Sequence, residues 1–215
     1  MKRHYLFDST IYYCFLHFIV FFYIYSVQFV GIPFGIGTRV FIGIMGFSVF
    51  FFENFSSKKA FRFPKQYLKI YSALIVISVI SFLSVMYNGS WQFDFVFKYQ
   101  VSLLTIIFAS YFVTKMVYKK KDFSDSSIPL IMRLFVNVVI IQIVIALIMF
   151  ISPAIRDLLN NIQLASDREA EVLEQTLEFR LVGFGSKFFG SGIINGFALI
   201  LIGSIIKFAN KSKIS

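Results

Sequence analysis

The chain has 215 residues, of which 58% are hydrophobic and 20% aromatic, and its formal net charge is +10. This apolar content exceeds what a water-soluble domain of this length normally carries, so the composition indicates a membrane protein. The positive charge does not indicate a nucleic-acid partner, because the basic residues flank long apolar runs, where they face anionic lipid headgroups.

Six apolar runs follow one another along the chain, each near the length of about 20 residues that a helix needs to cross a bilayer. In lipid every backbone polar group must be hydrogen-bonded within the protein, so the runs are predicted to be helical. We therefore expect an all-α, polytopic integral membrane protein, a single transmembrane domain over residues 1–215. Its predicted spans are 9–31, 38–53, 68–87, 99–118, 129–151 and 188–208.

The second run, residues 38–53, is distinguished by glycines. Those in it and just before it are Gly31, Gly35, Gly37, Gly43 and Gly46. Glycines let a neighbouring helix approach closely, and this is the interpretation we favour. The alternative is a helix that is broken where it lines a cavity.

Few polar side chains lie deep within the runs, and the main ones are Asn137, Gln142 and Asn195. Asn137 and Gln142 are five positions apart, which places them about 140° apart around one helix, so they cannot form a single polar stripe. The middle of the runs contains no Asp, Glu or Lys. This disfavours a proton-coupled transporter, which keeps ionisable groups within the membrane.

The lysines and arginines are unevenly divided between alternate gaps, and this predicts the orientation. Fifteen of the 21 belong to the N-terminus, residues 54–69, residues 115–133 and the C-terminal tail, and six belong to the remaining gaps and span ends. Basic residues near span ends are retained on the cytoplasmic side. Both termini are therefore predicted to be cytoplasmic, and the gaps 32–37, 88–98 and 152–187 are predicted to face outward.

The outer gap 152–187 is the longest and contains two helix-start signals. Ser152 and Pro153 suit the N-cap and first position of a helix, and Ser166 and Glu169 have the spacing of a capping box. Apolar residues then recur at helical spacing after each start. We expect two short amphipathic helices on the outer membrane surface, with these apolar positions against the lipid: Ile155, Leu158, Leu159, Ile162, Val172, Leu173 and Leu177.

The acidic residues of this gap fit a solvated helix face, which is the interpretation we favour. A pair such as Glu174 and Glu178 also suits acid–base chemistry or metal binding. No histidine is near them in the sequence, because His4 and His17 stand at the N-terminus and in the first run. We therefore expect no zinc site and no other metal.

The end of the gap joins basic residues to a glycine-rich stretch. Arg180 is followed by Gly183, Gly185 and Lys187, and the last run then begins. Glycines allow close backbone approach, and an arginine binds a phosphate or pyrophosphate by bidentate hydrogen bonds. The pattern suits a lipid-linked pyrophosphate at the outer surface. The alternative is an Arg and a Lys that extend from a span end to the headgroups.

These residues carry a family resemblance. The chain resembles the integral-membrane polymerases and ligases of bacterial surface polysaccharide, the O-antigen repeat-unit polymerase family. The shared features are several aromatic- and isoleucine-rich spans, a cytoplasmic N-terminus, and a long outer loop with an Arg-then-Gly motif before a span. The matching positions are Arg180, Gly183 and Asn195.

The resemblance implies a function: polymerisation of polyprenyl-pyrophosphate-linked oligosaccharide repeat units into O-antigen or capsule at the outer leaflet of the bacterial inner membrane. This is the reaction of a glycosyltransferase-type polymerase without a cofactor. Arg180, Glu174 and Glu178 would be catalytic, and the substrate would be held by Arg168, Arg180, Gly183, Lys187 and Asn195. The implied partners are the lipid-linked oligosaccharide, membrane lipids, a chain-length regulator and a flippase.

The chain also departs from the family pattern. The family's spaced Arg-to-Gly element is not met from Arg180, because position 191 is Ser191, and the usual Pro-Asn pair is absent. Most members are longer and have a second large outer loop, which implies an N-terminal fragment or a truncated member. Two alternative functions stay open: a lipid-linked glycan flippase, and a non-enzymatic membrane assembly subunit whose glycines mediate helix contacts.

Overall fold

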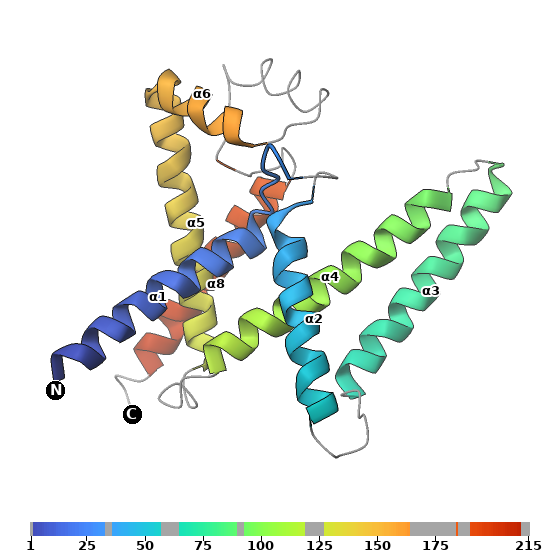
Figure 1. Cartoon of the computed structure of the whole chain (residues 1–215), viewed down its shortest axis with the longest axis horizontal. Coiled ribbons are helices and arrows are strands. Elements are labelled where there is room, and N and C mark those ends of the chain that lie inside the picture. The colour runs from blue at the N-terminus through green and yellow to red at the C-terminus, as the bar shows by residue number, and fades with distance from the viewer. Residues whose placement is uncertain are drawn as a thin grey trace. The chain divides into compact units, whose positions relative to one another are not determined.

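The computed structural model of the chain describes residues 2–32, 36–56, 65–89, 93–118, 127–163, 184 and 190–211. These residues form helices and, outside the helices, two isolated β-bridges, so the predicted all-α fold is confirmed for the part of the chain described (Figure 1). The helices are α1 (Lys2–Ile24), α2 (Thr38–Ser56), α3 (Lys65–Tyr87), α4 (Phe93–Tyr118), α5 (Ser127–Ile151), α6 (Pro153–Ile162) and α8 (Gly190–Lys211).

Each predicted run overlaps a helix, and the boundaries differ most at α1, which begins at Lys2 rather than residue 9 and also ends early, and at the start of α4. Helix α1 ends at Ile24, whereas the first span was predicted to continue to residue 31. The chain turns there because side chains at the start of α2 bind the last carbonyls of α1, as described below. Helix α4 begins at Phe93, six residues before the predicted start at residue 99.

Two helical stretches in the described ranges are long and apolar enough to cross a bilayer. They are Gln100–Tyr118, of 19 residues, and Leu130–Ile151, of 22 residues. At about 1.5 Å per residue, the second is about 33 Å long and matches a hydrocarbon core of about 30 Å. Three further apolar stretches, Thr10–Ile24, Ser72–Tyr87 and Gly192–Ile206, are shorter. Six spans therefore stay a prediction.

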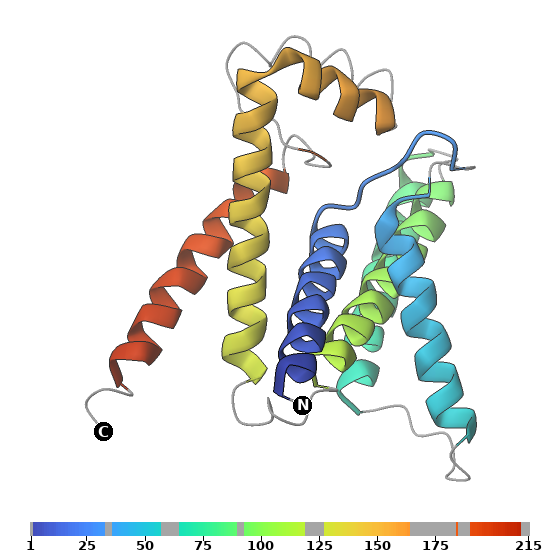
Figure 2. The same ribbon diagram turned by 60° about the vertical axis from the view of Figure 1, so that its left-hand side comes forward.

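The structure divides into two compact units, each described by itself. The first unit is Met1–Phe41 with Val113–Ser215, and the second is Ile42–Phe112. In the first unit α5 packs against α1, α6 and α8, and α6 turns away from the end of α5 (Figure 2). Leu16 of α1, Val117 at the end of α4 and Leu134 of α5 form a buried cluster in this unit.

The second unit depends on close approach at two glycines of α2. A Cβ added at Gly43 would lie 2.9 Å from Thr105 Cγ2, and one added at Gly46 would overlap the backbone carbonyl of Phe108. Helix α2 continues through both positions without a break. The predicted close packing at these glycines is therefore confirmed, and the broken-helix alternative is wrong for α2.

Aromatic rings fill the space beside this backbone contact. Phe47 meets Phe108 edge to face with ring centroids 5.1 Å apart, and Phe50 meets Phe108 at 5.8 Å and Tyr111 at 5.5 Å. Edge-to-face aromatic pairs at these distances contribute about 0.5–1.5 kcal/mol each beyond the area that they bury. The two glycines bring the helices close enough for the rings to meet.

Replacing Gly46 with alanine is expected to destabilise the second unit. The new Cβ would overlap the Phe108 backbone, which cannot rotate away as a side chain does, so the two helices must separate. Overpacking of this kind costs about 1–3 kcal/mol, which for a chain of this size lowers the Tm by about 2–12 °C. Thermal unfolding of the purified protein in detergent measures the shift.

Gly203→Ala is the matched control, because nothing lies within 4 Å of a Cβ added at Gly203. Its Tm should stay equal to that of the wild type or rise slightly, since alanine favours a helix over glycine. A Gly46→Ala protein that unfolds at the wild-type Tm would contradict the close approach of the two backbones.

Candidate functional site

The candidate site lies at one end of the first unit, where α1 ends and α2 begins. The last carbonyls of a helix have no partner within the helix and require outside donors. Arg39 supplies two: its Nε donates to Tyr23 O and its Nη2 to Ile24 O, each at 2.7 Å. The positive guanidinium also suits the negative end of the α1 dipole.

Thr38 completes this cap. Its Oγ1 donates to Phe22 O at 3.0 Å and accepts from Val27 N at 3.1 Å. One hydroxyl thereby binds both the end of α1 and the chain that leaves it. A threonine followed by an arginine at the start of α2 ends α1 at Ile24 and reverses the chain direction.

The residues after α1 run in extended conformation and pair with two other segments. Gln28 pairs with Gly37 just before α2, and Phe29 pairs with Gln163 at the end of α6. Val30 N also donates to Ile162 O at 2.9 Å. The α1–α2 connection and the end of α6 therefore lie at the same end of the first unit, as expected if the predicted outer gaps 32–37 and 152–187 face the same side.

Gly31 makes this connection sterically possible. Its φ of +92° lies in the left-handed region of the backbone, which residues with a Cβ rarely adopt. Here the glycine serves a turn, whereas Gly43 and Gly46 serve helix packing. The cluster of glycines in this part of the sequence thus serves two separate purposes.

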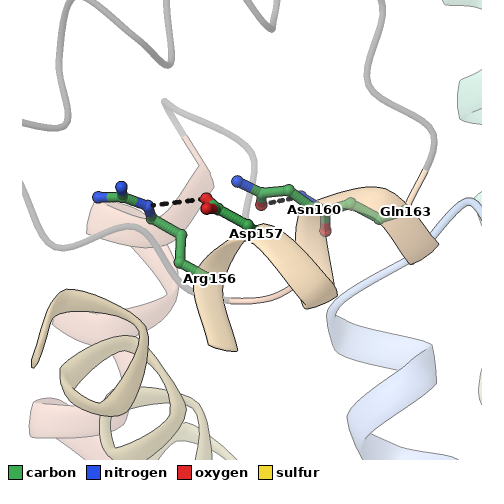
Figure 3. A network of polar contacts seen from close by, with 4 residues as sticks. All are labelled: Arg156, Asp157, Asn160 and Gln163. Carbon is green, nitrogen blue, oxygen red and sulfur yellow. Dashed lines mark hydrogen bonds and ion pairs between the residues drawn. The ribbon is translucent and has the colours of Figure 1, made fainter. Parts of the chain in front are cut away.

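Helix α6 confirms the first of the two helices predicted in the gap 152–187, and its place on the outer membrane surface stays a prediction. Pro153 occupies its first turn, and Ser152 occupies the N-cap position with extended backbone but makes no side-chain cap hydrogen bond. Its polar side chains interact along one side (Figure 3): Arg156 Nε lies 3.6 Å from Asp157 Oδ1, and Gln163 Nε2 donates to Asn160 Oδ1 at 3.4 Å. The second predicted helix lies outside the described residues.

The apolar side of α6 is exposed within the part of the chain that the structure describes. Leu158 is 60% exposed, and Ile155 and Ile162 are exposed as well. An amphipathic helix with this arrangement suits a membrane surface, with its apolar residues among the lipid chains and its polar residues in water.

Gln142 of α5 makes a buried hydrogen bond to a segment that is distant in the sequence. Its side chain is 5% exposed, and its Nε2 donates to Phe184 O at 2.7 Å. Phe184 is itself buried, and its ring lies 6.3 Å from the ring of Phe29, centroid to centroid. The chain shortly before α8 is therefore held against α5 and against the α1–α2 connection.

Asn137 faces a different partner from Gln142, as their 140° separation predicts. Its Nδ2 lies 3.2 Å from Nε2 of His17 on α1, and His17 Nδ1 lies 2.7 Å from Tyr13 O. A carbonyl oxygen only accepts, so Nδ1 carries the proton and Nε2 accepts from the Asn137 amide. The sequence showed His17 as a lone polar residue in an apolar run, but not which helix it would face.

The predicted site residues mostly lie outside the described ranges. These are Arg168, Glu174, Glu178, Arg180, Gly183 and Lys187. Asn195 is described: it lies on α8 with its side chain exposed. Phe184, which the sequence analysis did not single out, stands between Arg180 and Lys187 in the sequence and is itself described and buried.

Among the described residues, no three His, Cys, Asp or Glu side chains are grouped so that they could hold a metal ion.

Comparison with known proteins adds no assignment to this geometry. No protein-family model, no curated protein and no solved structure matches the chain. The chemistry of the site therefore has to come from its own residues.

Replacing Arg39 with alanine is expected to destabilise the first unit. It removes two hydrogen bonds from a charged donor to helix-end carbonyls, and such bonds contribute about 1.5–3 kcal/mol each before other groups take their place. A net loss of about 2 kcal/mol lowers the Tm by about 4–8 °C, which thermal unfolding in detergent measures.

Two further variants identify the cause. Arg39→Lys should restore less than half of the loss, because a lysine ammonium lacks the planar fork that reaches two carbonyls at once. Arg133→Ala removes an exposed arginine of α5 and should leave the Tm unchanged. Equal losses from Arg39→Ala and Arg133→Ala would show that general charge, rather than the cap, is responsible.

Proposed function

We propose that the chain is a multi-pass protein of the bacterial inner membrane with both termini in the cytoplasm. Two stretches are long and apolar enough to span, and the outer surface of one of them supports contact with lipid. Six large apolar residues of α5 are 41–50% exposed, namely Ile140, Ile141, Ile143, Val144, Leu147 and Ile148. Contiguous exposed apolar surface of this kind suits a membrane rather than water.

Within this membrane protein we propose polymerisation of polyprenyl-pyrophosphate-linked oligosaccharide repeat units into surface polysaccharide. The observation that carries the proposal is the buried contact of Phe184 with Gln142. It supports a position for Phe184 against α5, in a stretch of sequence that also contains Arg180 and Lys187. A basic stretch that leads into a predicted span suits a pyrophosphate that is anchored by its lipid and carries its sugar in water.

The proposed reaction is a glycosyl transfer between two lipid-linked glycans. A hydroxyl oxygen of the acceptor glycan attacks the anomeric carbon of the donor, and the bond from that carbon to the pyrophosphate breaks. Arg180, with Arg168 or Lys187, stabilises the negative charge that develops on the departing pyrophosphate. Glu174 or Glu178 accepts the proton of the attacking hydroxyl. Gly183 allows the backbone to approach the substrate, and Asn195 adds a hydrogen bond to it.

The flippase alternative is not supported by either of its two candidate groups. That reading needs charged side chains in a central cavity, for which Arg39 and Arg133 stood nearest to the spans. Arg39 is engaged with the carbonyls of α1, and Arg133 is exposed. Neither supplies a charge to the interior of the first unit.

The assembly-subunit alternative has one observation in its favour. Gly192, Gly196 and Gly203 of α8 have open space beside them, whereas Gly43 and Gly46 of α2 are filled by a neighbouring helix. Open glycines at this spacing suit a helix from another membrane protein, such as the chain-length regulator or flippase that the polymerase reading also implies.

Deleting the gene and restoring it as wild type or as Arg180→Ala tests the polymerase. A ladder gel of the surface glycan should collapse to single-repeat material on deletion, and only the wild type should restore it. An arginine at the pyrophosphate is expected to account for at least about a hundredfold in rate, since removing one donor to a developing charge costs about that much.

Arg156→Ala is the matched control, because Arg156 belongs to the same outer segment and is paired with Asp157 on α6. It should restore a full ladder at an equal protein level. A ladder that persists in the deletion strain rules out polymerisation. A normal ladder with Arg180→Ala rules out the role of that arginine.

Thiol labelling tests the orientation. In a Cys14→Ala background, which has no cysteine, Asp157→Cys should react with a membrane-impermeant maleimide in intact spheroplasts, because Asp157 is exposed on the predicted outer side. Ser215→Cys should react only after the membrane is opened. The opposite pattern would reverse the proposed topology.

A further inference from the structure

Arg39 is held at the junction of α1 and α2 by only part of its guanidinium. Its Nε donates to Tyr23 O and its Nη2 to Ile24 O, and these two contacts fix the position of the group. A guanidinium also carries N–H donors on Nη1 and a second one on Nη2. No acceptor among the residues that the structure describes takes up these donors. The group is therefore fixed in place with donors that remain available.

The positive charge of Arg39 has no acidic partner in the described part of the chain. The sequence contains no Asp or Glu between Asp8 and Glu53. The acid of α6, Asp157, pairs with Arg156 instead. The helix ends do not compensate the charge, because the negative end of α1 and the positive start of α2 carry partial charges of similar size. Arg39 is half-buried, and because a cation in such a position is usually paired, the junction suits an anion from outside the chain.

The two helices that meet at this junction, and the chain between them, expose apolar side chains. Phe18 of α1 is 61% exposed, Phe41 of α2 is 45% exposed, and Val30 is 57% exposed. The ring of Tyr23 lies beside the guanidinium, with its centroid 5.8 Å from Arg39 Cζ. Tyrosine is typical of the headgroup region of a bilayer, and exposed Phe and Val side chains suit acyl chains. An anion that is attached to acyl chains fits these features better than a free ion does.

We propose that Arg39 binds the phosphate of an anionic membrane lipid. The available N–H groups of Nη1 and Nη2 donate to the phosphate oxygens, since a planar guanidinium matches a phosphate with two parallel hydrogen bonds. The acyl chains lie against the exposed apolar side chains of α1 and α2. In the predicted orientation this lipid belongs to the outer leaflet. The site uses none of the residues of the proposed polymerase, so it stands or falls independently of that function.

Fluorescence quenching by brominated lipids tests the site in bilayers. Trp91→Phe removes the one tryptophan of the chain, and Phe41→Trp then places a reporter two residues after Arg39. Phosphatidylglycerol with brominated acyl chains should bind beside this reporter about fivefold more strongly than brominated phosphatidylcholine, the factor that one basic residue at a membrane surface supplies. A second reporter, Ile140→Trp, is the control, because Ile140 is an exposed residue within α5. The two lipids should quench it equally.

Variants then assign the preference to one side chain. Arg39→Gln keeps an amide donor but removes the charge, so the preference at the Phe41→Trp reporter should disappear. Arg39→Lys keeps the charge and should retain more than half of the preference, although it lacks the planar fork. Arg133→Ala removes an exposed arginine of α5 and should leave the preference unchanged. Where Arg39→Gln does not fold, the comparison of the two lipids with Arg39 in place still tests the site.

Three results would overturn the proposal. Equal quenching of the Phe41→Trp reporter by the two lipids shows that no anionic lipid is selected there. A preference that survives Arg39→Gln shows that another group selects the lipid. The third result is loss of the preference when inorganic phosphate replaces chloride at equal ionic strength, because the site then takes a free ion. A fivefold preference that persists in phosphate and disappears with Arg39→Gln confirms the site, whatever the glycan ladder shows.

Discussion

The organising constraint of this chain is that backbone polar groups need partners inside an apolar molecule. Helices satisfy most of them internally, and what is left concentrates at helix ends and in the connections. Thr38 and Arg39 bind the last carbonyls of α1, and Gln142 binds the carbonyl of Phe184. These three side chains therefore hold the end of α1 and Phe184 in the first unit.

The same constraint explains an apparent exception in the charge pattern. Arg39 is one of the few basic residues assigned to the outer side, where the distribution of positive charge disfavours arginine. Its guanidinium donates to two carbonyls at the negative end of α1. A residue with a single donor could not fulfil this structural role. Arg39 thus belongs to the cap, and its assignment to the predicted outer side does not weaken the predicted orientation.

Much of the architecture was predictable because it follows from local patterns. Apolar length predicted the helices, the Ser152-Pro153 pair predicted the start of α6, and a five-residue spacing predicted that Asn137 and Gln142 face different neighbours. The early end of α1 was not predictable, since the apolar run continues and only the distant Thr38 and Arg39 stop the helix. The role of Phe184 was hidden for the same reason: its partners Gln142 and Phe29 are far from it in the sequence.

The glycines of α2 and those of α8 differ in whether a neighbouring helix lies against them. In the second unit, Gly43 and Gly46 are in contact with a neighbouring backbone, so that surface of α2 has its partner. On α8, Gly192, Gly196 and Gly203 have space beside them, and Asn195 is exposed among them. An amide on an apolar helix gains most when a neighbouring helix supplies its hydrogen bond. Helix α8, which follows the loop 152–187 in the sequence, thus has room for a partner helix among the described residues, and this joins the proposed chemistry of the loop to the assembly of this protein with others.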